Sequence, residues 1–212
     1  ISDDSRIKAA LPTLKLLENE GAKVVVCSHF GRPKGQVVEE MRLAPVRERL
    51  SELLNTSVKD AGGPSGDQPS KVISLLSAGE FALLENLRFD PGEEANEPEF
   101  SKYLASLADI YVNDSFGAAH RAHASTAGVA AYLPAYAGFL MEREIEMLGS
   151  SLEGSTGATI AIIGGAKVAD KIQVLQHLAK NVDIILVGGG MVAAFYVAQG
   201  QSGGAAVITK EN

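Results

Sequence analysis

The sequence predicts an α/β fold: a parallel-sheet, three-layer (Rossmann-like) N-terminal domain that a helix joins to the start of a second α/β domain. Short apolar, β-branched runs alternate along the 212 residues with longer segments whose apolar residues recur at helical spacing. Loops rich in glycine and proline separate these segments. Strands that alternate with helices favour parallel pairing, because each helix returns the chain to the same end of the sheet.

The first domain is expected over residues 1–138, missing its first strand, since a domain that opens on a helix implies a strand upstream. The opening helix begins after two acidic residues, is kinked or broken at Pro12, and stops at Gly21. The acidic stretch 93–97 is expected to be a solvated loop and helix start. The other expected elements are strands at 23–28, 81–84 and 109–112, and helices at 43–54, 69–76 and up to residue 107.

Residues 139–153 are expected to form the interdomain helix, with a hinge near its end, because glycines follow a strongly helix-forming segment. A partial second domain is expected over 154–212. A two-stranded parallel sheet is not a credible independent domain, so the sequence indicates a fragment or a segment that stops early. The expected elements of this part are strands at 159–163 and 183–187 and helices at 168–179 and 191–198.

Composition narrows the function classes. The formal net charge is −7, which argues against the broad basic stripe of a nucleic-acid-binding face. No apolar run is long enough for a membrane span and no signal peptide is visible, which favours a cytoplasmic protein, with a plastid location after transit-peptide removal left open. Cys27, the one cysteine, falls in an expected buried strand and is interpreted as inert core packing.

Three expected strand ends are each followed by an arginine. His29 and Arg32 follow the first, Arg88 follows the second, and a loop with Arg121 and two flanking histidines follows the third. Taken alone, the last loop is as compatible with a solvated turn as with a site. The repetition favours a pocket for a small, highly charged anion, since the guanidinium fork binds carboxylate or phosphate bidentately.

A second set of cations lies downstream. Lys167 and Lys171 are four residues apart at an expected helix start, so they share one face, and Gly164 and Gly165 before them let backbone N–H groups approach phosphate. An exposed lysine pair and a simple turn at the glycine run 188–190 are the alternative interpretations. The spacing of a Walker motif is absent.

Five motifs in order resemble the phosphoglycerate kinase family. They are Ser28-His29-Phe30-Gly31-Arg32-Pro33, Leu84-Glu85-Asn86-Leu87-Arg88-Phe89, Gly117-Ala118-Ala119-His120-Arg121-Ala122-His123, Gly164-Gly165-Ala166-Lys167-Val168-Ala169-Asp170-Lys171 and Gly188-Gly189-Gly190-Met191.

This resemblance implies residue roles in two sites. In the first, Arg6 would stabilise the transferring phosphoryl group, with His120 nearby. In the second, Lys167 would neutralise that group, Lys171 would bind the nucleotide phosphates, and Gly188, Gly189 and Gly190 would lie beside the adenine. The residues that would hold 3-phosphoglycerate are Arg6, His29, Arg32, Arg88, Arg121 and His123.

The implied activity is that of a glycolytic kinase, which moves a phosphoryl group reversibly between 1,3-bisphosphoglycerate and ADP to give 3-phosphoglycerate and ATP. The implied cofactor is Mg-ATP or Mg-ADP, with the magnesium ligand expected outside this segment. The resemblance also implies a monomer, which is the default for the family. The alternative is a non-catalytic anion-binding fragment, since the 212-residue species is expected to be inactive alone. A dinucleotide-dependent dehydrogenase is poorly supported, because no Gly-x-Gly-x-x-Gly fingerprint opens a βαβ unit.

Overall fold

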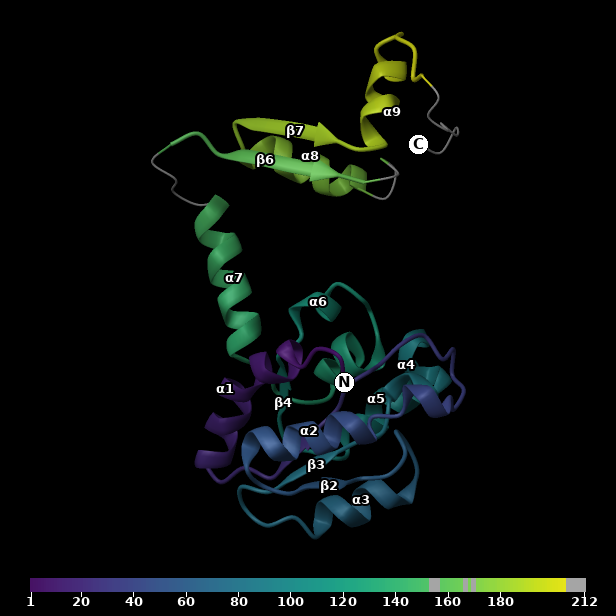
Figure 1. Ribbon diagram of the computed structural model, residues 1–212, viewed down its shortest axis with the longest axis vertical. Helices are drawn as coiled ribbons and strands as arrows, with labels where there is room; N and C mark the ends of the chain where they lie inside the picture. The colour runs from purple at the N-terminus through teal and green to yellow at the C-terminus, as the bar shows by residue number, and fades with distance from the viewer. Residues whose placement is uncertain (153–156, 166–167, 169–170, 205–212) are drawn as a thin grey trace. The chain divides into compact units, whose positions relative to one another are not determined.

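The chain divides into two compact units, residues 1–144 and 145–212. The computed structural model describes residues 1–152, 157–165, 168 and 171–204. Both units combine helices with parallel strands, which confirms the predicted fold class (Figure 1). The boundary between the units falls inside helix α7 (Phe139–Leu152). No helix among the described residues is long and apolar enough to cross a membrane.

The three-stranded sheet of the first unit has the order β1-β3-β2, with β3 (Phe81–Leu83) between β1 (Val24–Val26) and β2 (Val58–Asp60). Both pairings are parallel, and Val26 and Asp60 lie opposite Leu83. All three strands therefore end at the same edge of the sheet. Polar groups that follow these strands are brought together there.

Helices cover both faces of this sheet. Phe81 and Leu83 point to one face, where they pack with Leu14 of α1 (Ser5–Asn19) and Leu50 of α2 (Ala44–Leu54). Ala82 points to the other face and packs in a second cluster with residues of α5 (Pro98–Ala105) and of the segment after α3 (Asp67–Ser74). Figure 1 shows α2 and α3 on opposite sides of β2 and β3. The unit thus has the expected three layers, because strand side chains alternate between faces.

A second, two-stranded parallel sheet pairs β4 (Tyr111–Asn113) with β5 (Ala135–Ala137). The carboxyl end of β4 leads into the loop that carries Arg121, and the end of β5 leads into α7. The elements of the first unit between β3 and β5 not yet given are the 3-10 turn η2 (Leu87–Phe89), α4 (Pro91–Ala95), α6 (Phe116–Ala119), the π-helical turn η3 (Ala124–Gly128) and the 3-10 turn η4 (Val129–Ala131). A further 3-10 turn, η1 (Glu39–Met41), precedes α2.

Within the second unit, β6 (Ile160–Gly164) pairs in parallel with β7 (Ile184–Gly188), and Gly164 lies opposite Gly188. Helix α8 (Ile172–Asn181) connects the two strands, and α9 (Met191–Ala198) follows the second. The two glycines mark the shared edge at which both strands end.

Several expectations about local structure are wrong. Helix α1 is continuous through Pro12, and β2 and β5 lie where no strand was expected. β1 ends at Val26, so Cys27 lies beyond the strand and is exposed rather than packed in a core. The acidic stretch 93–97 is also not all solvated, because α4 forms there and Glu93 is buried.

Candidate functional site

Two strand ends of the first unit are joined by backbone hydrogen bonds. The N–H of Leu84 donates to the carbonyl of Val26 at 3.0 Å, and the N–H of Leu87 donates to the carbonyl of Ser28 at 3.1 Å. Beyond these bonds, the N–H of Gly35 donates to the carbonyl of Arg88 at 3.1 Å. The segment that carries His29 and Arg32 therefore runs beside the segment that carries Arg88, although the two are far apart in the sequence.

The buried amide of Asn86 fixes this pairing. Its Oδ1 accepts from the N–H of Phe30 and from the N–H of Arg88, both at 3.2 Å. Its Nδ2 donates to the carbonyls of Phe30 at 2.8 Å and of Met41 at 2.9 Å. Asn86 is fully buried, and each of its polar atoms is satisfied. A satisfied buried network of this kind holds a loop in one conformation.

Arg88 is a buried cation, with 3% of its surface exposed. Its Nη1 donates to the carbonyl of Gly31 at 2.7 Å, and its Nε lies 3.3 Å from Oε1 of Glu94. Among the described residues, Nη2 has no hydrogen-bond partner although it is buried. An unsatisfied donor on a buried guanidinium is costly, and an anionic ligand would satisfy it.

Hydrogen bonds within the loop after β4 fix its conformation. The hydroxyl of Thr126 donates to the carbonyl of Arg121 at 2.6 Å and accepts from the N–H of His123 at 3.1 Å. Nδ1 of His123 lies 3.6 Å from Oε1 of the buried Glu93. Arg121 and His123 are half-buried, whereas His120 is exposed.

The loops converge on His29. Burial, together with the positive charges of Arg88, Arg121 and His123, lowers the pKa of His29 to about 4. At neutral pH this imidazole is therefore uncharged in the absence of a ligand. The charges of two arginines thus act on a neutral histidine, a protonation state that the sequence analysis did not predict.

Two predicted residues are not joined to this group. Arg6, in the first turn of α1, and Arg32 are exposed. Among the hydrogen bonds and ion pairs of the described residues, none links either arginine to His29, Arg88, Arg121 or His123. The charge of Arg6 acts instead on Asp3, whose pKa is lowered mainly by hydrogen bonds from Ser5.

Both strands of the second unit end at a glycine, and these two glycines, Gly164 and Gly188, lie opposite each other. A Cβ added to Gly165 would lie 3.2 Å from Cε of Lys171 and 3.3 Å from Sδ of Met191, so a bare backbone faces the lysine stem. Gly189 has φ +66°, and a Cβ there would lie 3.4 Å from the carbonyl oxygen of Gly165. Such an edge suits close approach of a phosphate group to backbone. Lys167 lies outside the described residues, so its predicted position is untested.

The model of the phosphoglycerate kinase family matches residues 1–212. This chain belongs to the phosphoglycerate kinase family. It is 52% identical over 212 residues to the phosphoglycerate kinase of Acaryochloris marina and 53% identical over 209 residues to that of a Picosynechococcus species. The two alignments cover 100% and 98% of this chain but 53% and 52% of the relatives. The chain thus spans about half the length of the curated relatives it matches.

Solved structures agree with this assignment. The structure of phosphoglycerate kinase from Coxiella burnetii matches with a TM-score of 0.80 at 42% identity, over 94% of this chain and 50% of the other. The Pyrococcus horikoshii phosphoglycerate kinase matches with a TM-score of 0.77 at 37% identity, over 94% and 51%. The recognition made from five sequence motifs is confirmed.

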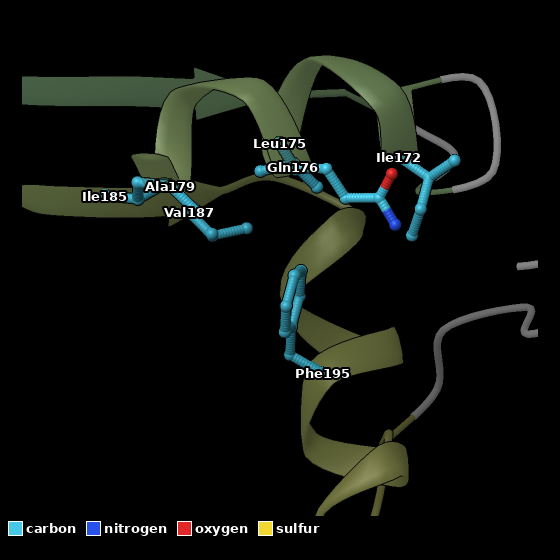
Figure 2. Close-up of a pocket in the computed structure, with 7 residues that line it drawn as sticks. All are labelled: Ile172, Leu175, Gln176, Ala179, Ile185, Val187 and Phe195. Carbon is cyan, nitrogen blue, oxygen red and sulfur yellow. The ribbon is translucent and has the colours of Figure 1, made fainter. Parts of the chain in front are cut away.

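An apolar hollow, drawn in Figure 2, lies within the second unit. It measures about 440 Å³ and lies between α8, β7 and α9. Gln176 supplies its one polar side chain among Ile172, Leu175, Ala179, Ile185, Val187 and Phe195. An anion gains nothing from such a lining, so the hollow is not the phosphate site.

Sequence reasoning missed two residues that organise the strand-end loops of the first unit. Asn86 was noted as part of a motif without a role, and Glu93 was placed on a solvated surface. A signal for Asn86 existed, since it is one of two polar residues, Glu85 and Asn86, that follow the apolar run 81–84. Glu93 gave no such signal, because it stands in an acidic run where exposure is the rule.

Metal binding is untested by the geometry. Within the part of the chain that is described, no group of three or more His, Cys, Asp or Glu side chains could hold a metal ion. The Mg²⁺ of a nucleotide complex was expected to be bound by residues outside this segment. That expectation stays a prediction.

Proposed function

We propose that the full-length protein carrying this chain transfers a phosphoryl group reversibly between 1,3-bisphosphoglycerate and ADP, giving 3-phosphoglycerate and ATP. The observation that carries this proposal is Arg88. Its buried guanidinium leaves Nη2 without a hydrogen-bond partner among the described residues, and the charges of Arg88, Arg121 and His123 all act on His29. A dianionic phosphate would satisfy Nη2 and lower the mutual repulsion of these groups.

The strand-end loops of the first unit would position the substrate. Arg88 and Arg121 would bind the phosphate of 3-phosphoglycerate with charge-assisted hydrogen bonds, and His29 and His123 would add N–H donors. Arg32 and Arg6 are exposed in the ligand-free chain, and we propose that they reach the substrate in the closed enzyme. Arg6 would then stabilise charge on the transferring group.

The nucleotide would occupy the glycine edge of the second unit. Lys171 is half-buried beside Gly165, and Gly188, Gly189 and Gly190 continue the same edge after β7. Lys171 would neutralise nucleotide phosphates, and Lys167 would face the transferring phosphoryl group. Bound Mg²⁺ would supply further charge neutralisation on the nucleotide phosphates. Phosphoryl transfer needs this positioning and neutralisation more than it needs covalent chemistry.

Calorimetric titration of the chain with 3-phosphoglycerate tests the first site. We expect binding that is selective over inorganic phosphate and weakens between low and moderate salt. A second arm measures turnover with ATP and 3-phosphoglycerate in a Coxiella burnetii phosphoglycerate kinase that carries residues 1–212 in place of its matching segment. A grafted enzyme that folds, binds both substrates and transfers nothing would contradict the proposed activity.

A second candidate concerns the 212-residue chain by itself, which covers only 53% of its Acaryochloris marina relative. We propose that this species binds anions without turnover. The same coupled assay on the chain alone decides it, since measurable Mg²⁺-dependent transfer would rule out a purely anion-binding role.

A further inference from the structure

We propose that Glu93 is a positioning residue of the anion site: its buried carboxylate fixes the loop of Arg121 and His123, and so sets the affinity for a phosphorylated ligand. This inference rests on the proposed function, because it concerns how the same site is held in its binding conformation.

The carboxylate of Glu93 is tied to the loop at three points. Its Oε1 accepts from the hydroxyl of Ser125 at 2.6 Å, and its Oε2 accepts from the N–H of Ser125 at 3.0 Å. Nδ1 of His123 lies 3.6 Å from Oε1. Both carboxylate oxygens thus bind Ser125 at the start of η3, and Oε1 also lies near His123, the residue before η3.

Because the Glu93 carboxylate is buried, loss of these contacts would be costly. Glu93 is 1% exposed, and a buried carboxylate is expensive unless hydrogen bonds and a cation compensate it. Its negative charge also helps to raise the pKa of Cys27 and of Tyr111, so both side chains lie within its field. Tyr111 in turn donates its hydroxyl to the carbonyl of Ser125 at 2.8 Å. Ser125 is therefore hydrogen-bonded both to Glu93 and to Tyr111, and these bonds fix the loop at this residue.

Glu93 and Glu94, which are adjacent in α4, contact residues that follow two different strands. The exposed carboxylate of Glu94 contacts Nε of Arg88, and the buried carboxylate of Glu93 contacts His123. Asp90 begins this short helix by accepting from the N–H of Gly92 at 2.9 Å. Adjacent residues of one rigid turn thus hold the cation after β3 and the histidine after β4 at a fixed separation. A ligand that bridges the two groups gains from that preorganisation.

The test is the affinity of the chain for 3-phosphoglycerate, measured by calorimetry on Glu93→Gln. The amide keeps the shape and one acceptor but removes the charge, so we expect about tenfold weaker binding, or about 1.4 kcal/mol. Glu99→Gln is the matched control, because Glu99 is an exposed carboxylate on the next helix that pairs only with Lys102 among the described residues. Equal affinity for Glu93→Gln and the parent chain would overturn the inference.

A double-mutant cycle with His123→Ala separates positioning from simple support of the fold. If Glu93 acts through the His123 loop, the two losses of affinity are strongly non-additive. Additive losses would contradict the inference.

If circular dichroism shows that Glu93→Gln does not fold, Ser125→Ala replaces it. That variant removes one bond and is expected to weaken binding about threefold. No effect on affinity in that variant would again overturn the role of Glu93.

Binding of 3-phosphoglycerate by the parent chain distinguishes failure of the positioning role from failure of the proposed anion site. Selective binding of 3-phosphoglycerate by the parent chain with no change in any Glu93 or Ser125 variant refutes only the positioning role. Absence of selective binding in the parent chain refutes the anion site itself, and the positioning role with it.

Discussion

The side chain of Asn86 and the backbone of Phe30 form a reciprocal pair: the amide oxygen accepts from the N–H at 3.2 Å while the amide nitrogen donates to the carbonyl at 2.8 Å. The two residues are 56 positions apart. This pair imitates a rung of a β-ladder with a side chain in place of the second strand. It continues the contact between β1 and β3 past the point where regular pairing stops.

Asn86→Ala should cost about 2–3 kcal/mol of unfolding free energy, because it removes four hydrogen bonds of a fully buried amide to the part-buried backbone of Phe30 and Met41 and to the buried Arg88. Urea denaturation measures this loss. Gln36→Ala, at an exposed position of the same loop, should change stability by less than about 0.5 kcal/mol. If both variants lose equal stability, Asn86 does not organise the loop.

Arg88→Gln should weaken binding of 3-phosphoglycerate by about 100-fold, since a buried guanidinium is lost from the phosphate site. The accompanying loss of stability should be smaller than the loss of binding energy. In the ligand-free chain the same change also removes the unpaired Nη2 from the interior. Calorimetry and thermal unfolding give the two quantities. Arg143→Gln, at an exposed arginine of α7, serves as the control and should leave affinity unchanged.

Acidification should destabilise the chain through His29. Its pKa is about 4 in the folded chain against 6.5 for the free group, so between these values the unfolded state binds more protons. The contribution of His29 to stability is fully present above about pH 6.5 and is lost as the pH falls toward 4. Unfolding free energies from pH 4.5 to 7.5 should therefore rise less steeply in His29→Gln than in the parent chain. Unchanged steepness would contradict this, and His177→Gln, at an exposed histidine, should match the parent.

Gly165→Ala should weaken ADP binding about fivefold in the grafted enzyme with little change in stability, because the new Cβ crowds Cε of Lys171. The lysine stem is flexible and can move aside, which displaces its ammonium group from the phosphates. Gly149→Ala, in helix α7 where a Cβ meets nothing within 4 Å, should bind ADP normally. Parent-like ADP affinity in Gly165→Ala would argue against Lys171 as a nucleotide ligand.

The sequence predicted the longer elements because their periodicity is strong. It failed at β2 and β5, which are only three residues long. Lys59 and Asp60 make up most of β2, and all three residues of β5 are exposed. Pairing with a neighbouring strand, not local propensity, defines such short strands. Pro12 likewise continues α1, although a proline was expected to interrupt it.

The cation loops were predictable because arginine after an apolar run is visible in the sequence. What could not be predicted was the chemistry between the loops. The low pKa of His29 depends first on its burial and then on the charges of Arg88 and Arg121, all of which arise only from the fold. Burial of Glu93 depends on how Ser125 turns after β4. Both are properties of tertiary contacts, to which local sequence patterns are blind.

The position of Cys27 has a practical consequence for handling the chain. The residue is open to solvent at a crowded strand end, where surrounding protein and the charge of Glu93 raise the pKa of its thiol to about 11. At pH 7 about one thiol in 10,000 is then ionised, and thiolate is the form that electrophiles and oxidants attack. Reagents that attack the thiolate should therefore label Cys27 slowly at pH 7, although the side chain is exposed.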